Sequence, residues 1–552
     1  MPTVTLNRAV FDSLIGKKIS AEQLKHHIAM IGTALERIDD KEIVVEVFPN
    51  RPDMLNEQGF ARALRSYLGI RSGLATYPVH KSGHKVIVDA SVTMRPYTAC
   101  AIVKNLKFDD ERIREVMQVQ EKLATTHGRN RKKSAYSIYP LETIHFPITY
   151  KALDPADVTF QPLGFAKSMK ASLVTEQHPK GKAYVHLTAG WKKFPFFIDA
   201  RGEVLSMLPF TNSHETGRIT ESTHDVFIEC TGTDYQNVSV ALNIIVTMLA
   251  DMGGTIFSIE VQYPRGKKAT PDLTPHGMKV DLSYVNKLLG ITLNSKEAAQ
   301  LLHRMGHGTD KDKALVPAYR ADILHPADLV EDIAIAYGFD KFKGEIPRVA
   351  TVAEEDALER FKSTLLELLI GAGFQETRSY HLMGHDQLTL MMNTNTPVVH
   401  LKNALVDYGC LRNSIIPSLL NILQRNQHYD NPQLLAEMGT TFHSNKKAEY
   451  GIKETCSLAL TMCDEKADFT KIRQMIDMTM RLLGIAGEIS EASHSSFIDG
   501  RVAKASVKGK NLALFGEIHP AVLAQWNIQT PVAAAEIDVE LLHDIATMKK
   551  TI

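Results

Sequence analysis

Long apolar runs, paired cysteines and an excess of charge of one sign are all missing from this 552-residue chain. The five cysteines form no CxxC pair, and the closest two are seven residues apart. This spacing argues against a disulfide framework or a cysteine zinc site and favours reduced, buried thiols. The cysteines are Cys100, Cys230, Cys410, Cys456 and Cys463.

No segment is apolar enough to span a membrane. The most apolar stretch, residues 238–250, contains Asn243 and Thr247 and is closed by Asp251. It is too short and too polar to cross a bilayer. Because no basic segment followed by an apolar run stands at the start of the chain, we expect a cytoplasmic protein without a secretory signal.

Charge is balanced, with 63 basic and 63 acidic residues. This balance argues against electrostatic binding of nucleic acid by the whole surface and leaves room for a local basic face. The chain also has no GxxxxGK[ST] phosphate loop and no GxSxG elbow. It therefore lacks two common signatures of nucleotide and ester chemistry.

The composition is that of an ordinary globular protein, 44% hydrophobic and 23% charged. A chain of this length exceeds a single core, so several domains are expected. Strands interspersed with helices predict an α+β multidomain fold. Proline and glycine punctuation divides the chain into segments 1–85, 86–268, 270–345 and 355–552.

The third segment carries the clearest local signals. A helical pattern over residues 282–289 is followed by Asn294 and Glu297, which have capping-box spacing. With a strand-like run at 314–319, these signals predict a small winged-helix-like module. In the fourth segment, apolar spacing predicts an amphipathic helix from Leu358 to the glycines at 371–373.

Four carboxylates gather near the end of the third segment. Pro326 fits the first turn of a helix and Gly338 its end, and three of the four acids then share one face. Converging carboxylates repel one another, and Mg²⁺ would relieve that repulsion. Acids in a first turn also complement the helix dipole on a solvated face, so spacing alone leaves both interpretations open. The carboxylates are Asp322, Asp328, Glu331 and Asp332.

Residues 316–338 resemble the signature of the B5 domain of phenylalanyl-tRNA synthetase β subunits. The resemblance implies that the same four acids bind magnesium near the junction with an α subunit. Further motifs similar to the family's follow in order over about residues 1–540, and the length favours the archaeal type. These motifs occupy residues 48–55, 95–103, 128–133, 204–213, 227–234, 411–420 and 515–520.

By the same resemblance, segment 86–268 is an editing domain of the B3/B4 kind. Segment 355–552 is a class II synthetase-like module, an antiparallel sheet with helices. A class II active site needs a paired arginine–glutamate motif and a glycine-rich segment ending in arginine. We find neither, so the resemblance implies a β subunit whose α partner carries the synthetic site. The expected assembly is an α2β2 heterotetramer that uses ATP and Mg²⁺ and binds tRNA(Phe).

The editing role implied by the resemblance is hydrolysis of mischarged tyrosyl-tRNA. The matching stretches give Ser213, Glu229 and Thr231 as candidate pocket residues. The alternatives are structural, because Ser213 could cap a turn, while Glu229 and Thr231 alternate along a predicted strand. The basic run at 129–133 either tracks RNA phosphates or is a solvated loop.

Two other functions stay open on sequence alone. The chain could be a stand-alone RNA-binding or assembly scaffold, or a free-standing tRNA-editing hydrolase. Co-purification with an α chain would separate these from a ligase subunit. His519 lies beside Glu517 but precedes Pro520, and this pattern favours a structural turn over acid–base chemistry.

Overall fold

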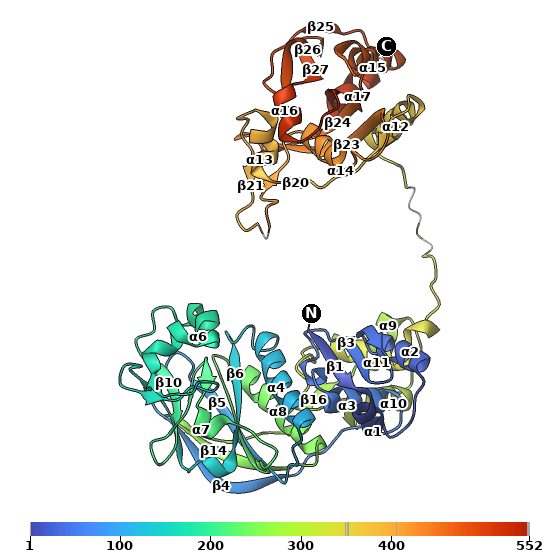
Figure 1. The fold of residues 1–552 in the computed structure, drawn as a ribbon. Coiled ribbons are helices and arrows are strands. Elements are labelled where there is room, and N and C mark those ends of the chain that lie inside the picture. Colours follow the sequence, from blue (N-terminus) through green and yellow to red (C-terminus); the bar gives the residue numbers. More distant parts are fainter. Residues whose placement is uncertain (1, 348, 350–352, 405, 549–552) are drawn as a thin grey trace. The chain divides into compact units, whose positions relative to one another are not determined.

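The computed structural model describes residues 2–347, 349, 353–404 and 406–548. They belong to two compact units, residues 1–346 and 347–552 (Figure 1). Both units combine sheets with helices, which confirms the α+β prediction. The first unit contains three of the predicted segments, whose internal boundaries stay predictions.

The first unit begins with a three-stranded antiparallel sheet of order β1-β3-β2. Asparagine and serine caps start the helices beside it, since their side chains accept the free N–H groups of a first turn. The elements are β1 (Thr3–Asn7), α1 (Arg8–Ile15), α2 (Ala21–Met30), β2 (Ala34–Ile38), β3 (Glu42–Glu46) and α3 (Glu57–Tyr67).

A ten-stranded mixed sheet follows, of order β12-β11-β10-β7-β4-β14-β5-β13-β6, with β15 paired to β14. Strand β4 runs parallel to both of its neighbours, and the other pairs are antiparallel. The strands are β4 (Val79–Val88), β5 (Tyr97–Lys104), β6 (Ser134–Pro140), β7 (Ile148–Leu153), β10 (Phe194–Ile198), β11 (Val204–Met207), β12 (Thr211–Asn212), β13 (Val226–Gly232), β14 (Thr255–Tyr263) and β15 (Gly266–Thr270).

Two helices pack against this sheet, α4 (Asp110–Thr125) and α8 (Tyr235–Asp251). Helix α8 is apolar nearly all round and is buried along most of its length. Each fully buried valine, leucine or isoleucine contributes about 1.5–3 kcal/mol relative to exposure. The helix therefore anchors strands β5 and β13, which it contacts.

The last part of the first unit is a small three-stranded sheet, of order β16-β18-β17, with three helices. The capping box between Asn294 and Glu297 is present, as predicted, and Gly290 ends the preceding helix in the left-handed conformation (φ 68°). The elements are β16 (His276–Lys279), α9 (Leu282–Leu289), α10 (Ser295–Arg304), β17 (Gly308–Asp310), β18 (Lys313–Val316) and α11 (Pro326–Tyr337).

The second unit is built on a seven-stranded sheet of order β19-β23-β24-β28-β27-β26-β25, antiparallel except for the β19–β23 pair. Its helices α12 (Ala357–Gly371), α15 (Phe469–Leu482) and α17 (Val539–Met548) share one apolar core with the sheet. The strands are β19 (Gln375–Glu376), β23 (Gln433–Ser444), β24 (Ile452–Cys463), β25 (Glu488–Glu491), β26 (Phe497–Val507), β27 (Lys510–Ile518) and β28 (Val532–Asp538).

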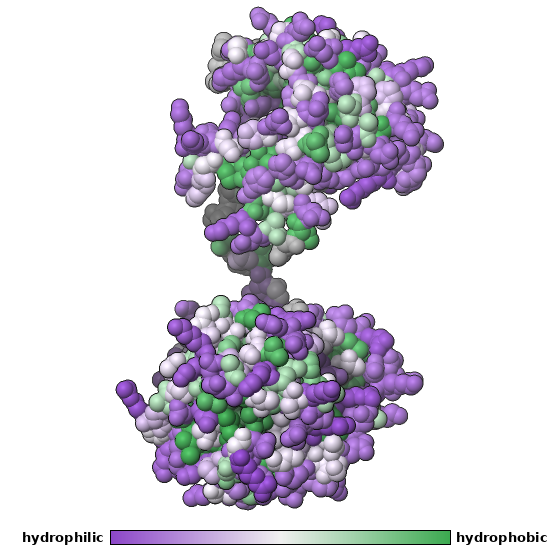
Figure 2. All heavy atoms as spheres, turned by 60° about the vertical axis from the view of Figure 1, so that its left-hand side comes forward, coloured by the Kyte–Doolittle hydropathy of each residue, from purple (hydrophilic) through white to green (hydrophobic). Residues whose placement is uncertain are grey.

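Hydrophilic side chains dominate the visible surface of each unit, with smaller hydrophobic patches between them (Figure 2). All five cysteines are free thiols; four are buried, as predicted, but Cys456 is half-buried. Within the described part of the chain, no helix combines the length and the apolar character needed to cross a bilayer.

Candidate functional site

A cavity of about 470 Å³ lies in the first unit, where the two ends of the ten-stranded sheet come together. Residues 135–138 of the end strand β6 line it, and so do residues 208–212, which lead into the opposite end strand β12. The short helix α7 (His214–Gly217) contacts both β6 and β11. The sheet is therefore curled, and the cavity lies between its two end strands.

Glu229, on strand β13, is a fully buried carboxylate (0% exposed) whose register partner, Ser137, lines this cavity. Its Oε1 accepts hydrogen bonds from the Tyr139 hydroxyl (3.0 Å) and the Ser206 hydroxyl (3.4 Å). Its Oε2 has no hydrogen-bond partner among the described residues. Burial raises the pKa of Glu229 to about 7, although the hydrogen bond from Tyr139 opposes the shift.

Ser137 connects Glu229 to the cavity. It faces Glu229 in the β6–β13 register and also lines the cavity. Neither Ser137, Tyr139 nor Ser206 was singled out from the sequence. For Ser137, opposite Glu229, and Tyr139, two residues further along β6, the pairing of β6 with β13 could have given the signal, because both side chains share a face with Glu229. Ser206 lies on β11, which pairs with neither strand.

The other two predicted editing residues are also buried, and none of the three forms the cavity wall itself. Ser213 stands at the N-cap of α7, between two residues that line the cavity, and its side chain makes no capping bond. The Thr231 hydroxyl has no partner among the described residues, while its carbonyl accepts a hydrogen bond from Arg95 (3.0 Å). Their roles in a pocket stay predictions.

The basic run at 129–133 holds a side chain that shapes the cavity. Arg131 lines it and donates to the carbonyls of Pro209 (2.9 Å) and Phe210 (3.1 Å). The Arg131 guanidinium also lies 4.8 Å from the centre of the Tyr184 ring. Arg131 therefore joins the α4–β6 loop to residues 209–210 in the cavity wall, which neither interpretation of this run anticipated.

The side chains of the four predicted magnesium ligands do not converge on one point in this structure. Arg320 pairs with both Asp322 (2.7 Å) and Asp332 (2.9 Å), and His307 Nε2 donates to Asp332 at 2.6 Å. Burial by itself would raise the pKa of Asp332, but Arg320 and His307 outweigh it and hold that pKa below its usual value. One arginine thus pairs with two of the four acids.

The remaining two acids point elsewhere. Asp328 accepts the backbone N–H groups of Leu324 and His325 (both 2.7 Å) at the start of α11, and Glu331 is exposed. Over the described residues, no group of three or more His, Cys, Asp or Glu side chains is placed to hold a metal ion. In this arrangement the four acids do not fit a shared Mg²⁺ site, and the ligand set stays a prediction.

Residues 48–55, predicted to be part of a family motif or a stiff turn, lie close to the same buried charges. Arg51 forms a bidentate pair with Asp53 (2.9 and 2.8 Å). Burial would raise the pKa of Asp53, but Arg51 and Arg320 lower it below its usual value. Arg51, Asp53 and Arg320 also line one small recess of about 90 Å³. The motif is therefore part of an ionic network within the first unit.

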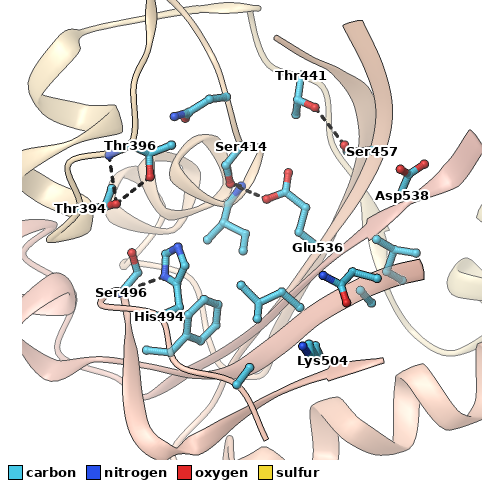
Figure 3. A pocket seen from close by; sticks show the side chains of 18 of the residues that line it. Thr394, Thr396, Ser414, Thr441, Ser457, His494, Ser496, Lys504, Glu536 and Asp538 are labelled. Atoms are coloured by element: carbon cyan, nitrogen blue, oxygen red, sulfur yellow. Dashed lines mark hydrogen bonds between the residues drawn. The ribbon is translucent and has the colours of Figure 1, made fainter. Parts of the chain in front are cut away.

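The second unit has a larger cavity of about 870 Å³ on its sheet (Figure 3). Hydroxyl groups on the strands line it, and Thr441 and Ser457 are hydrogen-bonded to each other (3.0 Å). Both oxygens of Glu536 are occupied, one by the Ser414 hydroxyl (2.5 Å) and one by the Ile415 N–H (2.8 Å). No arginine is among the described residues that line this cavity.

Arg412 is a buried arginine of this unit that is paired within the protein. Arg412 is 1% exposed and pairs with Glu437, which is 2% exposed, at 2.5 Å. A Cβ atom at Gly439 would lie 2.2 Å from Arg412 Nη2, so glycine makes room for the pair. His519 caps α16 (Pro520–Gln525) by accepting the Ala521 N–H (3.0 Å), which confirms its structural role.

Comparison with known proteins agrees with these features. Residues 343–539 match the model described as "Phenylalanyl tRNA synthetase beta chain CLM domain", and residues 278–339 match the "tRNA synthetase B5 domain". Both matches place the chain in the class of tRNA synthetase proteins.

Full-length relatives narrow this class. The phenylalanine–tRNA ligase β subunit of Archaeoglobus fulgidus is 37% identical, with 99% of each chain covered, and that of Thermococcus gammatolerans is 36% identical, with 98% and 99% covered. An N-terminal fragment of the β subunit from Pyrococcus horikoshii has a similar structure. Its TM-score is 0.58 at 38% identity, with 61% of this chain and 99% of that chain covered. The chain belongs to the family of phenylalanine–tRNA ligase β subunits.

Proposed function

We propose that this chain acts with an α subunit, in the cytoplasm, in the ATP-dependent attachment of phenylalanine to tRNA(Phe). The match to ligase β subunits over 99% of the chain carries this proposal. The second-unit cavity supports it, because amino-acid activation needs fixed positive charge at the reacting phosphates. No arginine is among the described residues that line this cavity; its lysines are Lys453 and Lys504, and Arg412 is paired with Glu437. We therefore assign the synthetic site to the α subunit.

Magnesium and stoichiometry belong to the same proposal. The complex is an α2β2 heterotetramer that uses ATP with Mg²⁺. A shared ion at Asp322, Asp328, Glu331 and Asp332 would require two of these acids to exchange Arg320 for the metal. The α subunit is the partner that could drive such an exchange.

The second part of the proposal is that the first-unit cavity hydrolyses mischarged tyrosyl-tRNA. Tyrosine differs from phenylalanine by one hydroxyl, and an apolar pocket rejects an added hydroxyl only on the order of 10²-fold. A site that binds the hydroxyl through a hydrogen bond can select the wrong product for hydrolysis. The unpaired Oε2 of buried Glu229 is the observation that carries this proposal.

Leaving a buried carboxylate oxygen unpaired costs roughly 1–3 kcal/mol or more, so a functional reason is expected for it. A tyrosyl hydroxyl that reached past Ser137 would donate to this oxygen and remove the cost. The hydroxyls of Ser213 and Thr231 would orient the ester or a water molecule. Phenylalanine offers no such donor and would leave Glu229 unsatisfied.

The test is hydrolysis of tyrosyl-tRNA by the enzyme reconstituted with a cognate α subunit. Glu229→Ala should lower the rate at least about tenfold, because the hydroxyl loses its acceptor. Charging with phenylalanine should be unchanged. Glu142→Ala, at an exposed acid in the same unit, is the matched control. Normal hydrolysis by a folded Glu229→Ala enzyme would remove Glu229 from the site.

A further inference from the structure

Basic charge is concentrated in residues 163–193 of the first unit. This segment contains six lysines and a single acidic residue, Glu176, in a chain whose total charge is balanced. All six lysines are exposed. They are Lys167, Lys170, Lys180, Lys182, Lys192 and Lys193.

This basic segment forms one wall of the first-unit cavity. Leu163, Gly164, His178 and Lys180 all line the cavity. The segment enters after β8 (Thr159–Phe160), contains α6 (Pro179–Tyr184) and leads into β10. Helix α6 lies beside β10 on one side of the first unit (Figure 1).

Contacts with the opposite wall fix the segment at the cavity mouth. Glu121 of α4 pairs with Lys180 (2.8 Å) and with Arg131 (3.0 Å), and Arg131 lies over the Tyr184 ring. The α4–β6 loop, which contributes Arg131 to the cavity wall, also carries the exposed side chains of Arg129 and Lys132.

Most of this charge is not neutralised locally. Lys180 pairs with Glu121, whereas the other five lysines of the segment form no ion pair among the described residues. A solvated protein face usually mixes charges of both signs, and here positive charge borders a concave site. The arrangement matches a chain of phosphates that passes the mouth of the cavity.

We propose that residues 163–193, with Arg129 and Lys132, bind the phosphates of a single-stranded RNA 3′ end and guide its terminal nucleotide into the cavity. This inference rests on the proposed editing function and names the surface that delivers its substrate. Lysines suit this task because they bind phosphates as point charges without reading the sequence. The cavity, at about 470 Å³, lies in the range of small-molecule sites, about 300–1,000 Å³.

The experiment measures binding of a single RNA strand to the full chain at several salt concentrations. The strand has the 3′ sequence of tRNA and carries no amino acid. The variant is Lys182→Gln, Lys192→Gln and Lys193→Gln combined. We expect affinity to fall about tenfold and the salt dependence to weaken by about 0.7 in log–log slope per lost phosphate contact. The control is Lys17→Gln with Lys18→Gln, another exposed pair, which should bind as wild type.

Wild-type affinity and salt slope in the triple variant would overturn the proposal. Equal losses on a blunt RNA duplex would also overturn it, because they would indicate general attraction to polyanions. The probe carries no ester, so this result is independent of hydrolysis. If Glu229→Ala still edits, the editing site is wrong and the RNA-binding result stands. If Glu229→Ala abolishes editing while the triple variant binds RNA normally, only this inference fails.

Discussion

The first-unit cavity of about 470 Å³ and the second-unit cavity of about 870 Å³ differ in how the buried carboxylates near them are satisfied. In the first unit, Glu229 keeps one oxygen without a partner among the described residues, and burial raises its pKa to about 7. In the second unit, Glu536 uses both oxygens, and Glu437 is paired with Arg412.

The first site therefore has a buried acceptor that a hydrogen-bond donor of a ligand could satisfy, whereas the polar groups of the second site are paired with one another. An unsatisfied buried group lowers stability unless a ligand completes it, so its retention points to function. A fully paired network rigidifies the fold and offers a ligand little. The first cavity is therefore the better candidate for chemistry on a substrate.

The largest expected effect concerns catalysis by the second unit. The chain alone should show no phenylalanine-dependent pyrophosphate exchange and should not charge tRNA. The reason is that no arginine is among the described residues that line the second-unit cavity. Adding a cognate α subunit should restore both activities, and the two chains should co-purify. Robust pyrophosphate exchange by the purified chain alone would show that the second-unit cavity is itself catalytic, which would contradict the comparison.

The next effect concerns stability of the second unit. Glu437→Ala should lower the free energy of unfolding by about 3–5 kcal/mol, because it leaves Arg412 buried without its carboxylate. Glu229→Gln should change it by no more than about 1 kcal/mol, since the unpaired oxygen contributes no bond. Denaturant unfolding followed by far-UV circular dichroism measures both. Glu449→Ala, at an exposed acid, is the control. Similar losses for Glu437→Ala and Glu229→Gln would contradict the comparison.

Another buried carboxylate, Glu57, tests the comparison through the pH dependence of stability. Burial and the nearby Glu115 raise the pKa of Glu57 to about 8. The folded state keeps this proton while the unfolded chain releases it near pH 4.5, so stability should fall as pH rises from about 4.5 to about 8. Glu57→Gln should be more stable than wild type by roughly 1–3 kcal/mol at pH 8 and similar at pH 4. A stability difference that does not depend on pH would show that Glu57 does not titrate in this way.

The smallest effect concerns Glu331, the exposed acid of the predicted magnesium set. Without an α subunit, Mg²⁺ should leave the unfolding midpoint unchanged, and Glu331→Ala should alter stability by about 0.5 kcal/mol or less. In the complex, Mg²⁺ should stabilise the wild type, and Glu331→Ala should reduce that stabilisation. Equal stabilisation by Mg²⁺ of the chain alone and of the complex would show that the site forms without α.

Local structure could be predicted from the sequence where the signal is local. The helix at 282–289, the capping box at Asn294 and the helix from Pro326 to the residue before Gly338 are all present. In each case, residues within one or two turns decide where the helix begins or ends. The helix predicted after Leu358 also ends close to its glycines, at Gly371.

The surroundings of the candidate residues could not be predicted in this way. Asp332 was expected on an acidic face, yet it is buried, because Arg320 and His307 pair with it there. Glu229 meets Tyr139 through the pairing of β13 with β6, but it meets Ser206, on β11, only after the sheet has curled. Such contacts depend on tertiary pairing of distant segments, which apolar periodicity does not encode.

The strand order of the ten-stranded sheet also has a consequence for synthesis of the chain. Strand β14 lies between β4 and β5, and Ile256 pairs in parallel with Val79. Until the ribosome has released β14, both older strands expose an unpaired backbone edge that invites association with other chains. A nascent chain that stops before Thr255 would therefore carry two such edges, so premature termination in this gene should yield aggregates rather than a smaller folded protein.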